Sequence, residues 1–195
     1  MRIHPYLCLL AGVMMLLSCS TRHTPKPSGY ARIELPPAAY TTFSPERIPC
    51  TFQVSMLVAA ENLPPTDTGE WIRLLYPSLS GAIHCSYLPV TRASLENAFQ
   101  DSYHLLVRQA EDTRSEINQY IYEDPSTGVY ASLFELSNAP ASPLQFVVTD
   151  SVSNFFRGTL LYDRFALDTD SLAPVTEYIK ADIRTLIESF RWTHP

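Results

Sequence analysis

Glycine and basic residues are both scarce in this sequence. Only 6 of the 195 residues are glycine, and neither G-x-G-x-x-G nor G-x-x-x-x-G-K-[ST] occurs, so the common phosphate-binding loops are missing. Lys and Arg number 14 against 20 Asp and Glu, which gives a formal net charge of −6. Neutralising the phosphates of a nucleic acid requires a surplus of basic side chains. The sequence therefore argues against nucleic acid as a partner and against a nucleotide cofactor.

Histidine is also scarce, with five residues. His84 and Cys85 are neighbours in an expected strand, where adjacent side chains point to opposite faces, so they do not form a thiolate–imidazole pair. No H-E-x-x-H or G-x-S-x-G motif is present. We therefore expect no catalytic residue, metal, cofactor or small-molecule substrate. A dispersed Ser–His–Asp triad stays open, because its members meet only in space.

The N-terminus has the pattern of an export signal. Arg2 precedes an uncharged run over residues 6–17, which is shorter than the roughly 20 residues that span a bilayer. The run ends in Leu16-Leu17-Ser18-Cys19, which resembles a bacterial lipobox, whose cysteine carries acyl chains such as palmitate. We expect a signal peptide at 1–18, lipidation of Cys19 and a tether at 19–29. The alternative is an ordinary cysteine beside a simple cleavage site.

The residues after Cys19 bear on which membrane would hold the lipid. In lipoproteins of many diderm bacteria, an Asp at the next position favours the inner membrane and an acidic cluster favours display outside the cell. Ser20 and Thr21 show neither feature. By comparison with those sorting signals, we expect a lipid anchor in the outer membrane with the protein facing the periplasm.

Two cysteines remain once Cys8 is removed and Cys19 is lipidated. Cys50 opens one expected strand and Cys85 lies within another. An oxidising compartment permits a disulfide between paired strands. The alternative is two buried free thiols that pack as small apolar groups.

The rest of the chain predicts a single α+β domain over residues 30–192. The 46% hydrophobic content is sufficient for a buried core. We expect strands at 30–35, 50–56, 71–76 and 83–88, separated by proline-rich connections such as Leu63-Pro64-Pro65. A helix capped by Ser94 follows, with one apolar stripe: Leu95, Phe99, Tyr103, Leu106 and Ala110.

The C-terminal half predicts an antiparallel meander and a second helix. Strands are expected at 117–123, 129–136, 144–149 and 155–162, with Gly128 in a turn and Gly158 at a bulge or a close contact. The helix has Asp170 as N-cap, Pro174 in its first turn, and two faces. The apolar face is Leu172, Val175, Ile179, Ile183, Leu186 and Phe190, and the polar face is Glu177, Lys180, Arg184, Glu188 and Arg191. Seven or eight strands and two packing helices form a layered sandwich whose element order resembles the PsbP/Mog1-like arrangement.

Two tripeptides resemble the D-[ST]-apolar acceptor of bacterial O-glycosylation. They are Asp150-Ser151-Val152 and Asp170-Ser171-Leu172, which makes Ser151 and Ser171 candidate sites. The pattern is short and also occurs by chance. Helix capping by Asp170 explains the second tripeptide equally well.

Several segments together resemble the gliding motility lipoprotein GldD family, over nearly all of the mature chain. The segments are Pro25 to Tyr30, Arg32-Ile33-Glu34-Leu35-Pro36, Trp71-Ile72-Arg73, Ser86-Tyr87-Leu88-Pro89-Val90, Gly128-Val129-Tyr130, Phe155-Phe156-Arg157-Gly158-Thr159-Leu160 and Phe190-Arg191-Trp192. The resemblance implies a non-enzymatic outer-membrane lipoprotein that supports gliding machinery and type IX secretion, by assembling or stabilising partner envelope lipoproteins. No catalytic residues come with the family.

A second reading stays open beside the resemblance. It is a periplasmic ligand-binding or hydrolytic lipoprotein that acts on glycan or peptide. A deep polar pocket that holds His84 or His104 beside a carboxylate would favour this reading, and a closed core would count against it.

Overall fold

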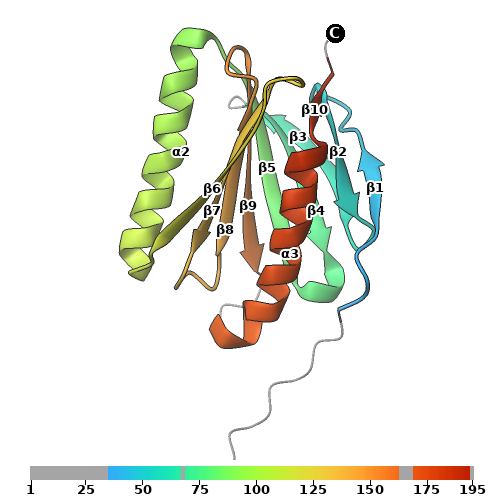
Figure 1. Ribbon diagram of the computed structural model, residues 1–195, viewed down its shortest axis with the longest axis vertical. Coiled ribbons are helices and arrows are strands. Elements are labelled where there is room, and N and C mark those ends of the chain that lie inside the picture. The colour runs from blue at the N-terminus through green and yellow to red at the C-terminus, as the bar shows by residue number, and fades with distance from the viewer. Residues whose placement is uncertain (1–34, 67–68, 163–168, 194–195) are drawn as a thin grey trace, which may run out of the picture. The chain divides into compact units, whose positions relative to one another are not determined.

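A seven-stranded antiparallel sheet carries the fold, and one long helix packs on each of its faces (Figure 1). The computed structural model describes residues 35–66, 69–162 and 169–193. The strands of this sheet are β3 (Ala59–Thr66), β4 (Gly69–Tyr76), β5 (Gly81–Pro89), β6 (Ile117–Asp124), β7 (Val129–Leu136), β8 (Leu144–Thr149) and β9 (Asn154–Tyr162). Their spatial order is β3-β4-β5-β9-β8-β7-β6.

A smaller sheet and two helices complete the described fold. The sheet contains β1 (Tyr40–Phe43), β2 (Cys50–Ser55) and β10 (Arg191–Trp192), in the order β1-β2-β10. The helices are α2 (Arg92–Thr113) and α3 (Thr169–Ser189), and a short 3-10 turn η1 (Pro77–Leu79) joins β4 to β5. Residues 33–195 form one compact unit. The expected signal peptide and tether, with Cys19, lie outside the described residues and stay predictions.

The predicted meander is confirmed. Strands β6, β7, β8 and β9 follow one another in the chain and lie side by side in the sheet. Gly128 has a φ of +65°, which suits glycine in the turn between β6 and β7. A Cβ added to Gly158 would lie 2.4 Å from the Phe146 ring, and the register of β8 with β9 is unbroken there. Of the two expectations for Gly158, the close contact is therefore the one observed.

The apolar stripe of α3 forms the main core with one face of the large sheet. All six stripe residues from Leu172 to Phe190 are buried, as predicted. The Phe190 ring lies 5.6 Å from Phe52 and 5.5 Å from Phe156, measured between centroids. Alternation along the strands places the even-numbered residues of β4, β8 and β9 on this face, because successive side chains point to opposite sides. The α+β sandwich with two packing helices is therefore confirmed.

The structure corrects the prediction around Pro64 and Pro65. These residues were expected in a connection, but they lie inside the edge strand β3. The register of β3 with β4 shifts between Leu63 and Thr66, so the two prolines fall where ladder pairing is interrupted. An edge strand tolerates proline because one side of its backbone needs no donor to a neighbour.

Short strands account for the other differences in strand number. The described residues contain ten strands rather than seven or eight, because β1, β3 and β10 were not expected. Strands of four and two residues carry too little alternation to be recognised in a sequence. For the expected strand at 30–35, residues 30–34 lie outside the described residues, and Leu35 is not in a strand.

The helix starts also differ from the prediction. The N-cap of α2 is Thr91 rather than Ser94, because the two residues form a capping box: Thr91 Oγ1 accepts from the Ser94 N–H at 3.2 Å, and Ser94 Oγ accepts from the Thr91 N–H at 2.9 Å. In α3, Asp170 lies within the helix rather than before it, and Pro174 lies beyond the first turn.

Lys180 is the clearest exception to the predicted polar face of α3. It was expected in solvent, yet it is 7% exposed. Its Nζ donates to Glu135 Oε2 at 2.9 Å and to Glu177 Oε1 at 3.1 Å, which ties α3 to β7. Asp182 is also buried and accepts from the hydroxyl groups of Tyr40 and Tyr76 at 2.9 and 3.1 Å. Burial raises the pKa of Asp182 although both tyrosines donate to it.

Candidate functional site

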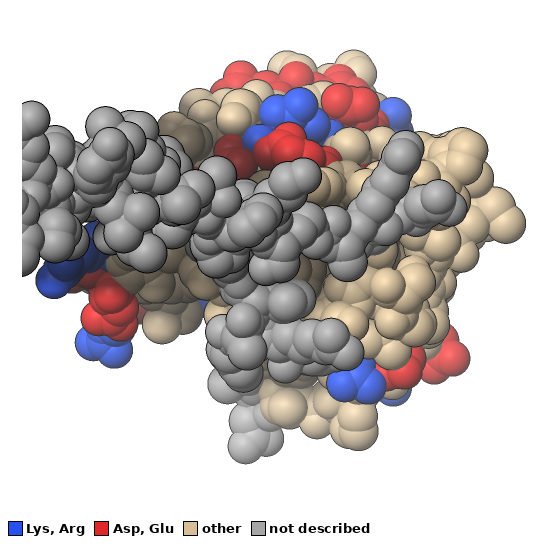
Figure 2. Space-filling view, turned by 90° about the horizontal axis from the view of Figure 1, so that it is seen from below, with Lys and Arg blue, Asp and Glu red and all other residues tan. Residues whose placement is uncertain are grey.

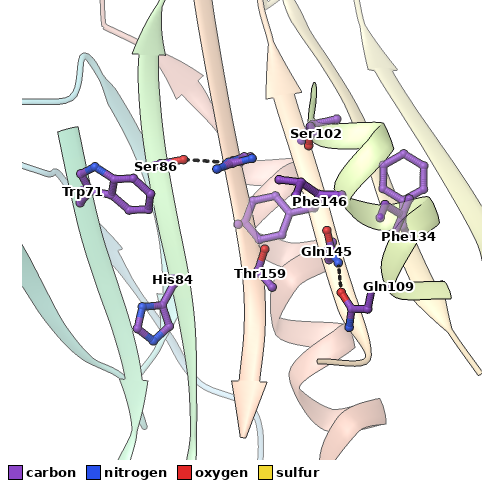
Figure 3. Close-up of a pocket in the computed structure, with 14 residues that line it drawn as sticks. Trp71, His84, Ser86, Ser102, Gln109, Phe134, Gln145, Phe146 and Thr159 are labelled. Atoms are coloured by element: carbon purple, nitrogen blue, oxygen red, sulfur yellow. Dashed lines mark hydrogen bonds between the residues drawn. The ribbon is translucent and has the colours of Figure 1, made fainter. Parts of the chain in front are cut away.

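A cavity of about 290 Å³ lies between α2 and the sheet face opposite to α3. Helix α2 forms one wall with side chains that include Ser102, Leu105 and Gln109. Strands β4, β5, β8 and β9 form the floor, and Figure 3 shows their side chains gathered below the helix. The cavity is open at this face because α2 buries few residues there, with only Leu106 and Ala110 buried among those of the helix.

Strand register aligns polar side chains on this floor. Across the strands, His84 pairs with Thr159, and Thr159 pairs with Gln145. In the adjacent row, Ser86 lies between Trp71 and Arg157. Directly paired residues of an antiparallel sheet point to the same face, so these six side chains share one surface. The name polar floor is used below for Trp71, His84, Ser86, Gln145, Arg157 and Thr159.

Hydrogen bonds hold two members of the polar floor in place. Arg157 Nε donates to Ser86 Oγ at 3.0 Å, which leaves both terminal nitrogens of the guanidinium group for other acceptors. Gln145 Nε2 donates to Gln109 Oε1 at 2.6 Å, and Gln109 Nε2 donates to the Ser142 carbonyl at 2.9 Å. Figure 3 draws the Arg157 and Gln145 bonds as dashed lines. This chain of amides fixes the Gln145 side chain against α2.

Arg157 differs from the other cations that contact the large sheet. Arg47, Arg73 and Lys180 each pair with a carboxylate, at distances from 2.6 to 3.1 Å. Arg157 is half-buried, and within the described part of the chain it has no ion pair. No Asp or Glu is among the described residues that line the cavity. The cavity therefore carries a positive charge that this part of the protein does not neutralise.

Trp71 forms the far wall of the cavity from β4 (Figure 3). Its indole Nε1 donates to Thr66 Oγ1 at 2.8 Å. Because this bond uses the polar atom of the indole, the part of the ring that faces the cavity is apolar.

The two candidate histidines lie in different places. His84 lies in the polar cavity, as the ligand-binding reading requires, but the carboxylate expected beside it is not among the described lining residues. His104 borders a furrow with Asp101 and Glu111, and all the lining residues of that furrow come from α2. The furrow follows the outer surface of one helix and is not a cleft between elements. Sequence reasoning singled out both histidines and missed Arg157, Gln145 and Thr159.

The two edges of the large sheet are unlike. At one edge, β3 carries Pro64 and Pro65 and an interrupted register. At the other edge, β6 pairs with β7 over all eight of its residues, contains no proline, and among the described strands has no second neighbour. Ile121 of β6 is 68% exposed and Tyr120 is 40% exposed. An edge strand with these properties can pair with an added strand.

Cys50 and Cys85 are free thiols in the main core. Both side chains are fully buried. Burial raises the pKa of Cys50 to about 12 and raises the pKa of Cys85 further. The arrangement corresponds to the alternative of two buried thiols, and a disulfide between them remains a prediction about the oxidised protein.

Ser151 lies in the tight turn between β8 and β9. It is exposed and has a φ of +66°. Asp150 organises this turn by accepting hydrogen bonds from the backbone N–H groups of Val152, Ser153 and Asn154 at 2.8–2.9 Å. Glycosylation of Ser151 stays a prediction. The side chain of Ser171 lies outside the described residues, as does Cys19.

Comparison with known proteins adds a family. The family model described as gliding motility lipoprotein GldD matches residues 20–192. This chain belongs to the GldD family. Family membership supports a lipoprotein that is held at a membrane by its anchor. Among the described residues, no helix is both long enough and apolar enough to span a bilayer.

Two further comparisons accompany the GldD match. No curated protein sequence matches the chain. Among solved structures, the chain is similar to the solution structure of cyanobacterial PsbP (CyanoP) from Synechocystis sp. PCC 6803, with a TM-score of 0.45 and 12% sequence identity. The alignment covers 83% of this chain and 97% of that chain.

Proposed function

We propose that this member of the GldD family is a non-enzymatic lipoprotein of the outer membrane, anchored through Cys19 and facing the periplasm. In this role it supports type IX secretion and the gliding machinery by assembling or stabilising partner envelope lipoproteins. Family membership supports the gliding assignment, and the export signal with its lipobox supports the location.

The exposed edge of β6 is the observation that carries the assembly role. The strand offers eight residues of backbone to an incoming strand, and Ile121 and Tyr120 offer apolar contacts on its two faces. Tyr120 is held rigidly, because its hydroxyl group donates to Glu135 at 3.3 Å and the Lys180 and Arg184 cations lie 5.3 and 4.9 Å from its ring centroid.

The surface away from this edge is mixed in charge. On the end of the molecule that Figure 2 shows, acidic and basic side chains are interspersed among uncharged ones, and the visible described residues form no large patch of one sign. Such a surface suits a protein partner better than a polyanion.

The test uses a strain in which the gene is deleted and then restored with variants. We expect the deletion to reduce release of type IX cargo and the abundance of other gliding lipoproteins. An Ile121→Lys variant places a charge at the proposed strand-pairing edge, and we expect it to reduce both readouts at least several-fold. Both wild type and Met56→Lys should restore them, because Met56 is a 70% exposed apolar residue outside the large sheet.

Each contrary result has its own meaning. Normal secretion with intact lipoproteins in the deletion strain would refute the proposed role. Full restoration by Ile121→Lys would refute the β6 edge as the contact surface. A Cys19→Ala variant that still fractionates with the outer membrane would refute lipid anchoring.

A further inference from the structure

The polar floor has the composition of a binding site for a small anion. It combines a cation without a carboxylate partner, several hydroxyl and amide groups, and one aromatic wall, all under α2. We infer that this cavity binds a single-ring sugar acid, that is, a hydroxylated ring that bears a carboxylate. This inference goes beyond the proposed function and does not depend on the β6 edge.

The carboxylate is assigned to Arg157. Its guanidinium group is positioned by the Nε bond to Ser86, so Nη1 and Nη2 can donate together to the two oxygens of one carboxylate. The site is half-buried, where a charged hydrogen bond is stronger than in open solvent. With no Asp or Glu among the described lining residues, a cationic ligand would meet only repulsion there.

The ring hydroxyls are assigned to the row of Thr159 and Gln145. Gln145 uses its Nε2 on Gln109, and within the described residues its Oε1 accepts no hydrogen bond, so a ligand hydroxyl can donate to it. Thr159 Oγ1 has no hydrogen-bond partner among those residues and can donate or accept. Adjacent hydroxyls on a sugar ring match such a pair, because each hydroxyl both donates and accepts.

Trp71 and the size of the cavity limit the ligand to one ring. The apolar part of the Trp71 indole can cover the C–H face of a sugar ring. A volume of about 290 Å³ lies at the lower end of the range for small-molecule sites, which is about 300–1,000 Å³. An oligosaccharide would therefore extend beyond the cavity.

The test is a binding titration of the full lipidated chain in detergent, followed by calorimetry and by NMR. The probes are glucuronate and galacturonate, with glucose as the uncharged ring and with acetate and inorganic phosphate as anions without a ring. We expect at least one sugar acid to bind tenfold or more tightly than glucose, acetate and phosphate.

Variants locate the binding within the molecule. Arg157→Gln should weaken binding of the sugar acid at least tenfold. Arg108→Gln should leave it unchanged, because Arg108 is exposed on the outer side of α2. Since Arg157→Gln could disturb the sheet, Ser102→Phe provides a second route: it fills the cavity from α2 and should also abolish binding.

Three results would overturn the inference. The first is the absence of binding of both sugar acids. The second is equal binding of acetate, phosphate and the sugar acids, which would indicate an unspecific anion site. The third is unchanged binding in a folded Arg157→Gln or Ser102→Phe variant, which would place the ligand elsewhere.

Discussion

The two faces of the seven-stranded sheet are built for different tasks. The face toward α3 is a closed apolar core in which Phe52, Phe156 and Phe190 pack together. The face toward α2 contains two small apolar clusters and, between helix and sheet, the polar floor. A sheet with one dry face obtains its stability there, which leaves the other face available for binding.

The strand β9 makes this contrast within neighbouring residues. Phe156 points into the main core, whereas Phe155 and Arg157 point to the α2 side. The same strand thus contributes to stability with one set of side chains and to the candidate site with the other.

The largest expected effect comes from the adjacent phenylalanines of β9. We expect Phe156→Ala to reduce the free energy of unfolding by about 3–5 kcal/mol, because it leaves a cavity among rings that cannot relax. Phe155→Ala should cost less, about 2–3 kcal/mol, because Leu95 and Phe99 beside it are only partly buried and can move. Urea unfolding of both variants measures the difference. Equal losses would show that the α2 face is as tightly packed as the α3 face.

A smaller effect is expected at the turn that joins the two floor strands. Burial acts to raise the pKa of Asp150, but the N–H groups of Val152, Ser153 and Asn154 and the Asn154 side chain outweigh it and lower the pKa to about 2. A lowered pKa in the folded state stabilises the protein above the unfolded value near 4, and this contribution is lost as the pH falls from about 4 to 2.

Asp150→Asn tests this turn. After allowing for solvent screening, we expect the variant to lose about 1 kcal/mol at pH 7 and to approach the wild type near pH 2. Thermal unfolding of the two proteins at both pH values gives the comparison. A difference that does not change with pH would mean that the carboxylate charge has no part in holding the turn.

The smallest expected effect is on thiol reactivity in the dry face. Because Cys50 and Cys85 are buried and their pKa values are raised, an alkylating reagent should modify neither in the folded protein at pH 8. After denaturation without reductant, peptide mapping should find both alkylated. If both become reactive only after reductant is added, the cysteines form the alternative disulfide. Labelling of the folded protein would contradict a closed core.

Much of the fold could be predicted from the sequence because its main elements are long and periodic. The stripe of α3 and the four meander strands have patterns that depend on local spacing alone, and the observed bounds differ by one residue or less for the strands of the meander. Strand β3 was missed because proline suppresses a strand prediction, although an unpaired edge removes the reason for that suppression.

The candidate site could be predicted only in part. His84 drew attention because histidine is rare, whereas Arg157 and Thr159 belong to an ordinary-looking strand. A signal was present: both are polar residues at alternate positions of a strand whose other face is apolar. Alternation of this kind shows that a strand has one polar face, but it does not show which strands lie beside it.

The sequence by itself determined the export signal, the kinds of the main elements and the apolar face of α3, because each follows from a local pattern of residues. The tertiary structure decided the rest. It placed Arg157 beside Ser86 and Thr159 beside Gln145, and it buried Lys180 against Glu135. The physical reason is strand register, which depends on pairing between segments up to 71 residues apart and on the cost of burying a charge without a partner.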